Sequence, residues 1–303
     1  LTKNKRLFPD FLIIGYHKAG TTSLYDYLVQ FENIGSAQKK EVQFFALSYW
    51  RGLQWYRTFF PTNLTKKKIE MKTNEKFITG EASPYYIFHP LSLERIHKTL
   101  PDIKLILLLR NPIDRAYSHY MHQRRLKKEN VNTFEKVIEK DEERFEVMYK
   151  MFKEDKIREY NQEKYGIPYI SIGKYVRDVK KLLELFPADQ ILILKSDEFE
   201  QSPLNVIKDV LKFLGITSKE KIDLRKKNIG KYNEMNINTR TKLIDYYKPY
   251  NQELQKICTA NIKHEIGKCT YTHMLNEGAG IETDLTVVCI DKNHFRIISS
   301  AAV

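Results

Sequence analysis

An apolar strand that ends in a glycine turn and leads directly into a helix constrains this chain more than any other stretch. Residues 11–28 read FLIIGYHKAGTTSLYDYL, and Thr21 or Thr22 is placed to cap the helix. In α/β proteins, such a strand-turn-helix unit directs the backbone N–H groups of the helix N-terminus toward an anion. The segment therefore predicts a phosphate-binding loop.

Two further uninterrupted apolar segments have the character of buried strands. Residues 103–112 read IKLILLLRNP, and residues 189–199 read DQILILKSDEF. Helical patterns lie between these segments, and buried strands that alternate with helices predict an α/β fold with a parallel sheet covered on both faces. Ligands of such sheets bind beyond the carboxyl ends of the strands, where GYHKAGTT and RNP both fall.

The lysine of the loop is placed differently from the lysine of a nucleotide-binding P-loop. Gly15 and Gly20 have the P-loop spacing, but Lys18 precedes the second glycine instead of following it. Nucleoside triphosphatases usually have a strand that ends in a metal-binding Asp, whereas LILLLR ends in Arg110. The sequence thus predicts a P-loop-like fold with a second cation for phosphate, although a glycine turn with a lysine also occurs by chance.

The charge of the chain restricts its classes of partner. The 303 residues include 51 Lys and Arg against 38 Asp and Glu, and the net charge of +13 favours anionic partners. We expect no nucleic acid among them, because the lysines are scattered among acids and no zinc-finger, RNP-like or Arg/Gly pattern occurs. No apolar run reaches about 18 residues, so we expect no membrane segment in this chain.

The cysteines favour a reducing compartment. Cys258, Cys269 and Cys289 lie near the end of the chain, so residues 1–257 cannot form a disulfide. Their spacing is a poor match to a metal site, and small buried side chains are the simpler interpretation. We expect a cytoplasmic protein. Since the chain begins with Leu1 and not with Met, this expectation leaves room for an upstream leader or anchor.

Several blocks of the sequence, taken in order, resemble one enzyme family. The glycine loop, EVQFFALSYWRGLQWYRTFFP and LLLRNPIDRAYSHYMHQRR are similar to the sulfotransferases that use 3′-phosphoadenosine-5′-phosphosulfate (PAPS). The resemblance is strongest to the heparan-type branch, which includes the N-deacetylase/N-sulfotransferases, and it runs from Pro9 to Leu254. It implies a sulfotransferase domain over residues 1–253 that moves a sulfuryl group from PAPS to a hydroxyl or amine of a carbohydrate-like acceptor, without a metal.

The resemblance also implies which residues bind the donor. The 5′-phosphosulfate would be held by the loop residues Lys18, Ala19, Gly20, Thr21, Thr22 and Ser23. Lys18 would in addition stabilise charge on the bridging oxygen as the S–O bond breaks. Arg110 and Ser118 match the pair that binds the 3′-phosphate, a role suited to a bidentate guanidinium and a hydroxyl. Lys231 matches a late basic residue that closes over the donor phosphates.

A base is implied on the acceptor side. Glu41 of EVQFF matches the base of the family, and His122 of YMHQR matches a histidine of the same cleft. A positioned base contributes roughly 10²- to 10⁴-fold to such a reaction. Without the resemblance, Glu41 is typical of a surface acid and His122 of a partly buried helix residue. Ala82 of GEASPYY stands where several heparan-type enzymes carry a lysine, so one acceptor-side cation is missing.

The end of the chain resembles a different family. YTHMLNEGAGIETDLTV and HFRIISSAA are similar to part of the folate-binding domain of the glycine-cleavage T-protein and of dimethylglycine and sarcosine dehydrogenases. About fifty residues of a larger sheet cannot bury a core alone. We therefore predict that residues 254–303 are a partial T-protein-like segment that arose by fusion or truncation, and we assign it no folate chemistry.

Two other functions are compatible with the same residues. A P-loop kinase that acts on a small molecule would need Mg²⁺ and ATP, and the position of Lys18 argues against it. A non-catalytic basic module would bind anionic polymers with strong salt dependence and would be indifferent to substitution of Glu41.

The segment DLRKKNIGKYNEM is short and has no cysteine, which favours a bacterial-type sulfotransferase.

Overall fold

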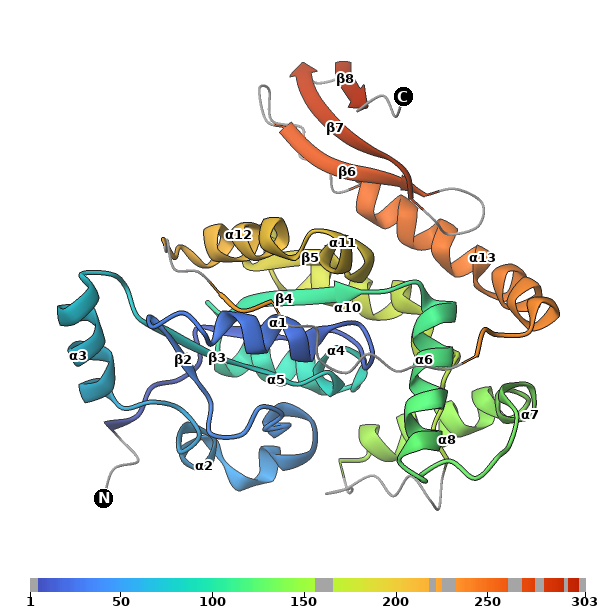
Figure 1. Cartoon of the computed structure of the whole chain (residues 1–303), viewed down its shortest axis with the longest axis horizontal. Coiled ribbons are helices and arrows are strands. Elements are labelled where there is room, and N and C mark those ends of the chain that lie inside the picture. The colour runs from blue at the N-terminus through green and yellow to red at the C-terminus, as the bar shows by residue number, and fades with distance from the viewer. Residues whose placement is uncertain are drawn as a thin grey trace.

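The centre of the molecule is a parallel sheet of five strands in the order β2-β3-β1-β4-β5 (Figure 1). The computed structural model describes residues 5–155, 166–217, 222–224, 233–260, 269–275, 281–291 and 294–299. The strands of this sheet are β1 (Phe11–Ile13), β2 (Ile34–Ser36), β3 (Ile78–Ala82), β4 (Lys104–Leu109) and β5 (Ile191–Lys195). All neighbouring pairs are parallel, which confirms the predicted α/β fold.

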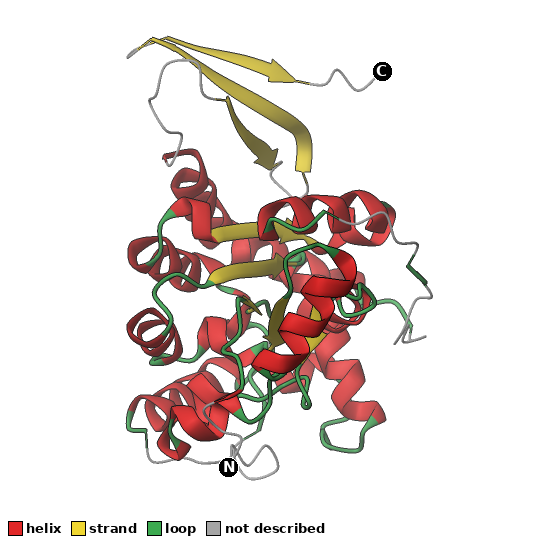
Figure 2. Ribbon diagram, turned by 90° about the vertical axis from the view of Figure 1, so that its left-hand side faces the viewer, coloured by secondary structure: helices red, strands yellow, loops and turns green. Residues whose placement is uncertain are grey.

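Helices cover both faces of the sheet (Figure 2). On one face, α1 (Thr21–Leu28) contacts α12 (Pro203–Leu214); elsewhere α10 (Tyr175–Leu185) contacts α5 (Ser92–Thr99) and α13 (Ile237–Ala260). The remaining α-helices are α2 (Leu53–Arg57), α3 (Asn63–Thr73), α4 (Tyr85–Phe88), α6 (Pro112–Arg125), α7 (Phe134–Ile138), α8 (Asp141–Lys153) and α11 (Ser196–Gln201). Shorter helical turns are η2 (Phe44–Ser48), η3 (Tyr49–Arg51), η4 (Ser171–Gly173) and η5 (Ala188–Gln190).

The predicted apolar strands occupy the middle and one side of the sheet. The three residues of β1 are completely buried, and β1 pairs with β3 on one side and β4 on the other. Because helices shield both faces, every side chain of such a central strand is apolar. After β1 the chain first adds strands on one side of it, β2 and β3, and then on the other side, β4 and β5. Ligands of parallel sheets bind at the carboxyl ends of the strands where the strand order changes direction in this way.

The sequence did not identify β2 and β3 as strands. β3 contains Gly80 and Glu81, two residue types that are depleted in strands, and β2 has three residues with a glycine in the middle. β3 is nevertheless buried along its whole length. The buried Glu81 carboxylate is tolerated in this strand because hydroxyl and backbone N–H groups around it donate hydrogen bonds to it.

A second, antiparallel sheet of three strands follows in the sequence. It consists of β6 (Cys269–Leu275), β7 (Ile281–Asp291) and β8 (His294–Ser299), in that order. Helix α13 continues across the predicted junction between residues 253 and 254 without a break. The division into residues 1–253 and 254–303 therefore stays a prediction, with its boundary inside one helix.

Candidate functional site

The glycine loop between β1 and α1 has a tightly restricted backbone. Gly20, at the N-terminal end of α1, has a φ of 95°, in the left-handed region that favours glycine. A Cβ atom on Gly15 would lie 2.9 Å from the backbone nitrogen of Leu108, so no larger residue fits beside β4. Lys18 also adopts a left-handed conformation, with a φ of 68°. Non-glycine residues rarely do so, and they cluster at functional sites.

Side chains from two other strands bind the carbonyl groups of this loop. The Arg110 guanidinium, after β4, donates from Nη1 to the carbonyl of Lys18 at 3.1 Å. The Ser196 hydroxyl, after β5, donates to the carbonyl of Ala19 at 2.5 Å. The first N–H groups of a helix have no acceptor within the helix. With its carbonyls engaged from outside, the loop presents these N–H groups and the Lys18 side chain to the space in front of α1.

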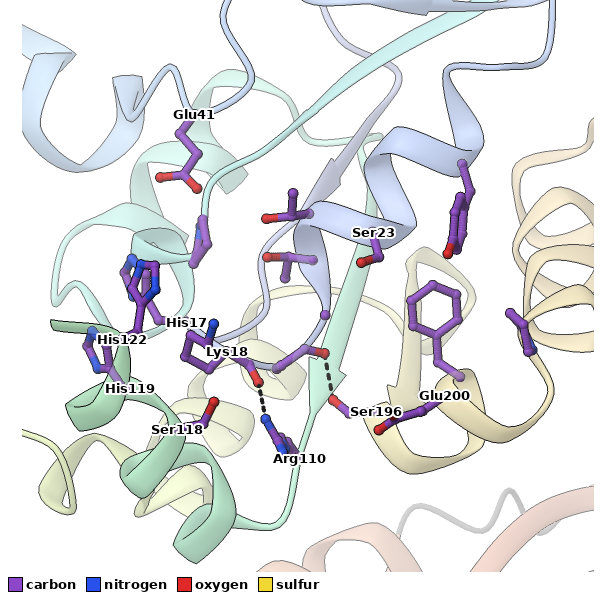
Figure 3. Close-up of a pocket in the computed structure, with 18 of the residues that line it drawn as sticks. His17, Lys18, Ser23, Glu41, Arg110, Ser118, His119, His122, Ser196 and Glu200 are labelled. Carbon is purple, nitrogen blue, oxygen red and sulfur yellow. Dashed lines mark hydrogen bonds between the residues drawn. The ribbon is translucent and has the colours of Figure 1, made fainter. Parts of the chain in front are cut away.

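A pocket of about 630 Å³ lies in front of the loop. Among the residues that line it are the predicted site residues Lys18, Ala19, Gly20, Thr21, Thr22, Ser23, Glu41, Arg110, Ser118 and His122. Figure 3 shows Glu41 and three histidines toward one end of the pocket and Ser196 and Glu200 toward the other. Residues far apart in the sequence are thus brought together as predicted, whereas Lys231 lies outside the described residues.

Positive charge is concentrated around Lys18. Burial lowers the pKa of Lys18, and the positive charges of Arg125 and Arg110 lower it further. The pKa of His122 is lowered by burial and then by Lys18 and Arg125. Burial contributes most to both pKa shifts, and repulsion between these like charges adds to it. An anion bound between Lys18 and Arg110 would relieve this repulsion, so the residues present fit a phosphate or sulfate group.

A hydrogen bond from Arg125 selects one tautomer of the neutral His122 ring. Its Nδ1 atom lies 3.0 Å from Nη2 of Arg125. A guanidinium group can only donate, so Nδ1 accepts and the neutral ring carries its hydrogen on Nε2. His122 therefore presents a donor and not a proton acceptor through Nε2.

The segment that carries Glu41 is fixed through its backbone N–H groups. Val42 N–H donates to Oε2 of Glu81 at 3.0 Å, and the next two N–H groups donate to Ser83 Oγ at 3.1 Å and to Tyr86 Oη at 2.8 Å. All three acceptors lie on β3 or directly after it. The position of Glu41 at the pocket is therefore set by the end of a central strand.

Glu81 is the centre of this arrangement. It is 0% exposed, and its carboxylate accepts hydrogen bonds from the hydroxyls of Tyr56 and Tyr86, each at 2.7 Å, and of Ser83 at 2.8 Å. Burial raises the pKa of Glu81, and the hydrogen bonds oppose that rise. Glu81 supports the site from behind and is not in the pocket lining.

Sequence analysis missed two histidines of the pocket. The rings of His17 and His119 stack with their centroids 5.3 Å apart and their planes 5° apart, and His17 also meets the edge of Tyr85. Burial lowers the pKa of His17 to about 3, and burial together with His17 lowers the pKa of His119 well below its usual range. Both rings are therefore neutral at neutral pH. The available signals were the position of His17 beside Lys18 and the helical spacing of His119 from His122.

Further residues of the lining were also missed, among them Gln123, Ser196 and Glu200. Gln123 contacts His119, with its Nε2 atom 3.2 Å from the ring Nε2. Within the part of the chain that the structure describes, no group of three or more His, Cys, Asp or Glu side chains is arranged to hold a metal ion. Among the same residues, no helix has both the length and the apolar character needed to cross a membrane.

Comparison with known proteins decides the family. The sulfotransferase domain family matches residues 8–264, most of the chain. The chain belongs to the sulfotransferase family. Among solved structures, a sulfotransferase from Alicyclobacillus acidocaldarius is 28% identical, with a TM-score of 0.63, and the match covers 83% of this chain and 96% of that one.

Curated relatives place this sulfotransferase domain near enzymes of heparan sulfate. The bifunctional heparan sulfate N-deacetylase/N-sulfotransferase 1 of Xenopus laevis is 31% identical over 281 residues, covering 82% of this chain and 30% of that protein. The membrane-associated sulfotransferase kil1 of Dictyostelium discoideum is 26% identical, covering 84% of this chain and 66% of that protein. The chain thus spans about 30% of the length of the first of these relatives.

The end of the chain matches a second family. The GCVT N-terminal domain matches residues 250–303, which confirms the predicted resemblance to the T-protein. The two family matches overlap over residues 250–264. This overlap lies mostly within α13, the helix that crosses the predicted junction.

Proposed function

We propose that this sulfotransferase domain uses PAPS and transfers its sulfuryl group to a hydroxyl or amine of a carbohydrate-like acceptor. One observation carries the proposal: Lys18, the pair Arg110 and Ser118, and Glu41 all line the same pocket in front of α1. The first three suit a donor with two phosphate positions, and Glu41, which lies beyond the histidines from Arg110, supplies a base (Figure 3).

The donor is expected to bind along the positively charged half of the pocket. The N-terminal N–H groups of α1 and the hydroxyls of Thr21, Thr22 and Ser23 would hold the 5′-phosphosulfate. Arg110 and Ser118 would hold the 3′-phosphate, which distinguishes this donor from ordinary adenine nucleotides. Lys18 lies at the loop itself, where it would neutralise charge on the oxygen that leaves as the S–O bond breaks.

Transfer moves one proton and exchanges one bond at sulfur. The acceptor oxygen or nitrogen forms a bond to sulfur, the bond from sulfur to the bridging phosphate oxygen breaks, and 3′,5′-adenosine bisphosphate leaves with the electron pair. Glu41 takes the proton of the acceptor, since His122 presents a donor through Nε2. His122 is suited to orient the acceptor or the sulfuryl oxygens instead. Positioning and charge stabilisation carry such a reaction without a metal.

The carbohydrate class of the acceptor is proposed from the relatives. A relative that is 31% identical is named for N-sulfation of heparan sulfate, and the matched part of it is aligned with this domain. Ala82 of this chain is fully buried in β3 and offers no cation to an anionic sugar chain. We therefore propose a carbohydrate-like acceptor and do not extend the proposal to heparan sulfate itself.

Calorimetric titration tests the donor site directly. The chain would be titrated with 3′,5′-adenosine bisphosphate and with 5′-AMP, each in the presence and absence of Mg²⁺. We expect metal-independent binding that requires the 3′-phosphate and falls by about 100-fold or more in Arg110→Ala, because a partly buried charge-assisted contact is lost. Equal binding of the two nucleotides, or binding of neither, would overturn the proposal. Binding that depends on Mg²⁺ would favour a kinase.

Acceptor identity is tested with ³⁵S-labelled PAPS and a panel of amino and hydroxyl oligosaccharides. Incorporation of label into a sugar by the unmodified chain, and its loss in Glu41→Gln, would support the proposed transfer. Label that appears to the same extent with Glu41→Gln would contradict the role of Glu41 and leave the donor site intact.

A further inference from the structure

Lys40 lies beside the loop and the proposed base, although neither the motif resemblance nor the charge pattern singled it out. Its ammonium group donates a hydrogen bond to Oγ1 of Thr22, on the first turn of α1. The same nitrogen lies 3.7 Å from Oε1 of Glu41. The side chains of Lys40 and Glu41 are 27% and 34% exposed, so the contact is partly shielded from solvent. One ammonium group thus joins both halves of the pocket.

The backbone of Lys40 is anchored independently of these contacts. Its carbonyl accepts a hydrogen bond from Ala82 N–H at 3.3 Å, and the N–H of Val42 donates to Glu81. The two bonds flank Glu41 and attach this short segment to the end of β3. The Lys40 side chain therefore extends from a fixed point of the sheet and not from a free surface loop.

The chemistry of the two partners determines which way the Thr22 hydroxyl points. An ammonium group has three donors and no acceptor, so Thr22 must accept from Lys40 with an oxygen lone pair. The hydroxyl hydrogen of Thr22 is then directed away from Lys40. Within the described parts of the chain, that hydrogen has no acceptor, and Thr22 lines the pocket. It is free to donate to a ligand oxygen.

We propose that Lys40 is a positioning residue that fixes the Thr22 hydroxyl as a hydrogen-bond donor to the anionic group bound at the loop. The inference rests on the proposed function, because it assigns to that group the 5′-phosphate end of the donor. Lys40 also faces Oε1 of Glu41, which leaves Oε2 as the oxygen that receives the acceptor proton. A single side chain thereby sets the placement of the base relative to the group that is transferred.

The test measures binding of 3′,5′-adenosine bisphosphate by calorimetry and needs no acceptor. Lys40→Met removes the ammonium group, Lys40→Arg keeps a donor-only cation, and Thr22→Val removes the hydroxyl. Lys39→Met is the matched control, because Lys39 is an exposed neighbour that carries the same charge, whereas Lys40 is half-buried and contacts Thr22 and Glu41. Thermal unfolding of each variant verifies that the fold is retained.

We expect Lys40→Met to weaken binding about tenfold, Lys40→Arg to recover most of the loss, and Lys39→Met to bind like the unmodified chain. Because Lys40 acts through Thr22, the double variant Lys40→Met/Thr22→Val should bind no more weakly than Thr22→Val alone. A merely structural role would lower the unfolding temperature without this coupling.

Two results would overturn the role of Lys40 alone: wild-type affinity in Lys40→Met, or additive losses in the double variant. Equal losses in Lys39→Met and Lys40→Met would also overturn it, because they would indicate general charge and not a specific contact. Failure of the unmodified chain to bind the bisphosphate would instead overturn the proposed function, and the role of Lys40 with it. The two failures are therefore distinguishable.

Discussion

The two segments that meet at the pocket are held in opposite ways. The loop at Lys18 and Ala19 is held by its carbonyl groups, which accept from Arg110 and Ser196. The segment at Val42 to Phe44 is held by its N–H groups, which donate to Glu81, Ser83 and Tyr86. The N–H of Ala19 donates to the carbonyl of Tyr16, but the first N–H groups of α1 have no acceptor within the helix and are available to a ligand, whereas the N–H groups of the second segment are consumed.

This difference accounts for which half of the pocket can take phosphate. An anion needs donors, and the start of α1 offers its first N–H groups while Lys18 adds a cation. The segment after Glu41 has no spare N–H group at residues 42–44, so its contribution to a ligand comes from the Glu41 side chain. The anchoring of each segment, and not its sequence alone, supports the proposal that the donor binds at the loop and that Glu41 is the base.

The largest expected effect follows from removing the buried anchor of the second segment. Glu81→Ala would leave the hydroxyls of Tyr56 and Tyr86 and the N–H of Val42 without their acceptor in the core. We expect the free energy of unfolding in urea to fall by about 3–5 kcal/mol. Glu143→Ala, at an exposed acid of α8, is the control and should stay within about 0.5 kcal/mol of wild type. A similar loss in both variants would contradict the anchoring role.

Glu41 should affect catalysis, whereas Glu81 affects stability. Glu41→Gln should lower the rate of sulfuryl transfer roughly 10²- to 10⁴-fold, because the acceptor proton loses its base. Its stability should be unchanged, since Glu41 is partly exposed and contacts Lys40 at 3.7 Å. Rate measurements at saturating donor check the transfer rate, and urea unfolding checks the stability. Destabilisation of the size expected for Glu81→Ala would show that the two carboxylates do not differ as described.

As the pH falls, His17 and Glu81 should change the free energy of unfolding in opposite directions. The folded-state pKa of His17 is lowered to about 3, so the unfolded chain binds more protons below about pH 6.5 and stability falls on acidification. The slope is at most about 1.4 kcal/mol per pH unit for this group. Burial raises the pKa of Glu81, so protonation there favours the folded state as the pH falls. Urea unfolding between pH 7 and pH 4 measures the balance.

A variant of His17 isolates its contribution to that pH dependence. His17→Asn should reduce the loss of stability between pH 6.5 and pH 5 without abolishing it, since burial also lowers the pKa of His119 and of His89, whereas His97→Asn, at an exposed position of α5, should leave it unchanged. If His17→Asn loses stability with acid as steeply as wild type, the lowered pKa is not the cause.

The smallest expected effect concerns the outer support of the loop. Ser196→Ala removes the hydroxyl that donates to Ala19, and a hydrogen bond of this kind contributes about 1 kcal/mol. We expect that loss in unfolding free energy and a few-fold weaker binding of 3′,5′-adenosine bisphosphate, because Arg110 still holds the neighbouring carbonyl. Ser36→Ala, at an exposed position of β2, is the matched control. Unchanged binding in Ser196→Ala would show that Arg110 alone orients the loop.

Sequence pattern identified the strands with uninterrupted apolar residues and missed those whose burial depends on specific contacts with other segments. The β1, β4 and β5 strands were predicted because apolar residues run through them without interruption. β3 was missed because Glu81 interrupts its apolar pattern. The burial of Glu81 depends on tyrosines 25 residues before and five residues after it in the sequence, and no local window contains that information.

The candidate site divides in the same way. The loop residues, Arg110 and Glu41 lie in contiguous motifs, so the sequence pattern singled out the loop and Arg110, and the family resemblance added Glu41. His119 faces the pocket through the rotation of α6 and through stacking on His17, a contact between residues 102 positions apart. Lys40 acquires its partners because β3 fixes the backbone on both sides of Glu41. The spacing of His119 from His122 places both on one face of α6, but the partners of His119 and Lys40 depend on the fold and cannot be read from local sequence.

Helix α13 also determines where this chain could be shortened for crystallisation. Leu254 is only 9% exposed and packs in the main core, and the Tyr247 hydroxyl on the same helix donates to the carbonyl of Ile170 at 2.7 Å. A stop codon after residue 253, at the boundary suggested by family resemblance, would remove an apolar side chain from that core. A shortened chain intended for structural work should therefore retain the helix at least through Ile257, which also packs against the core.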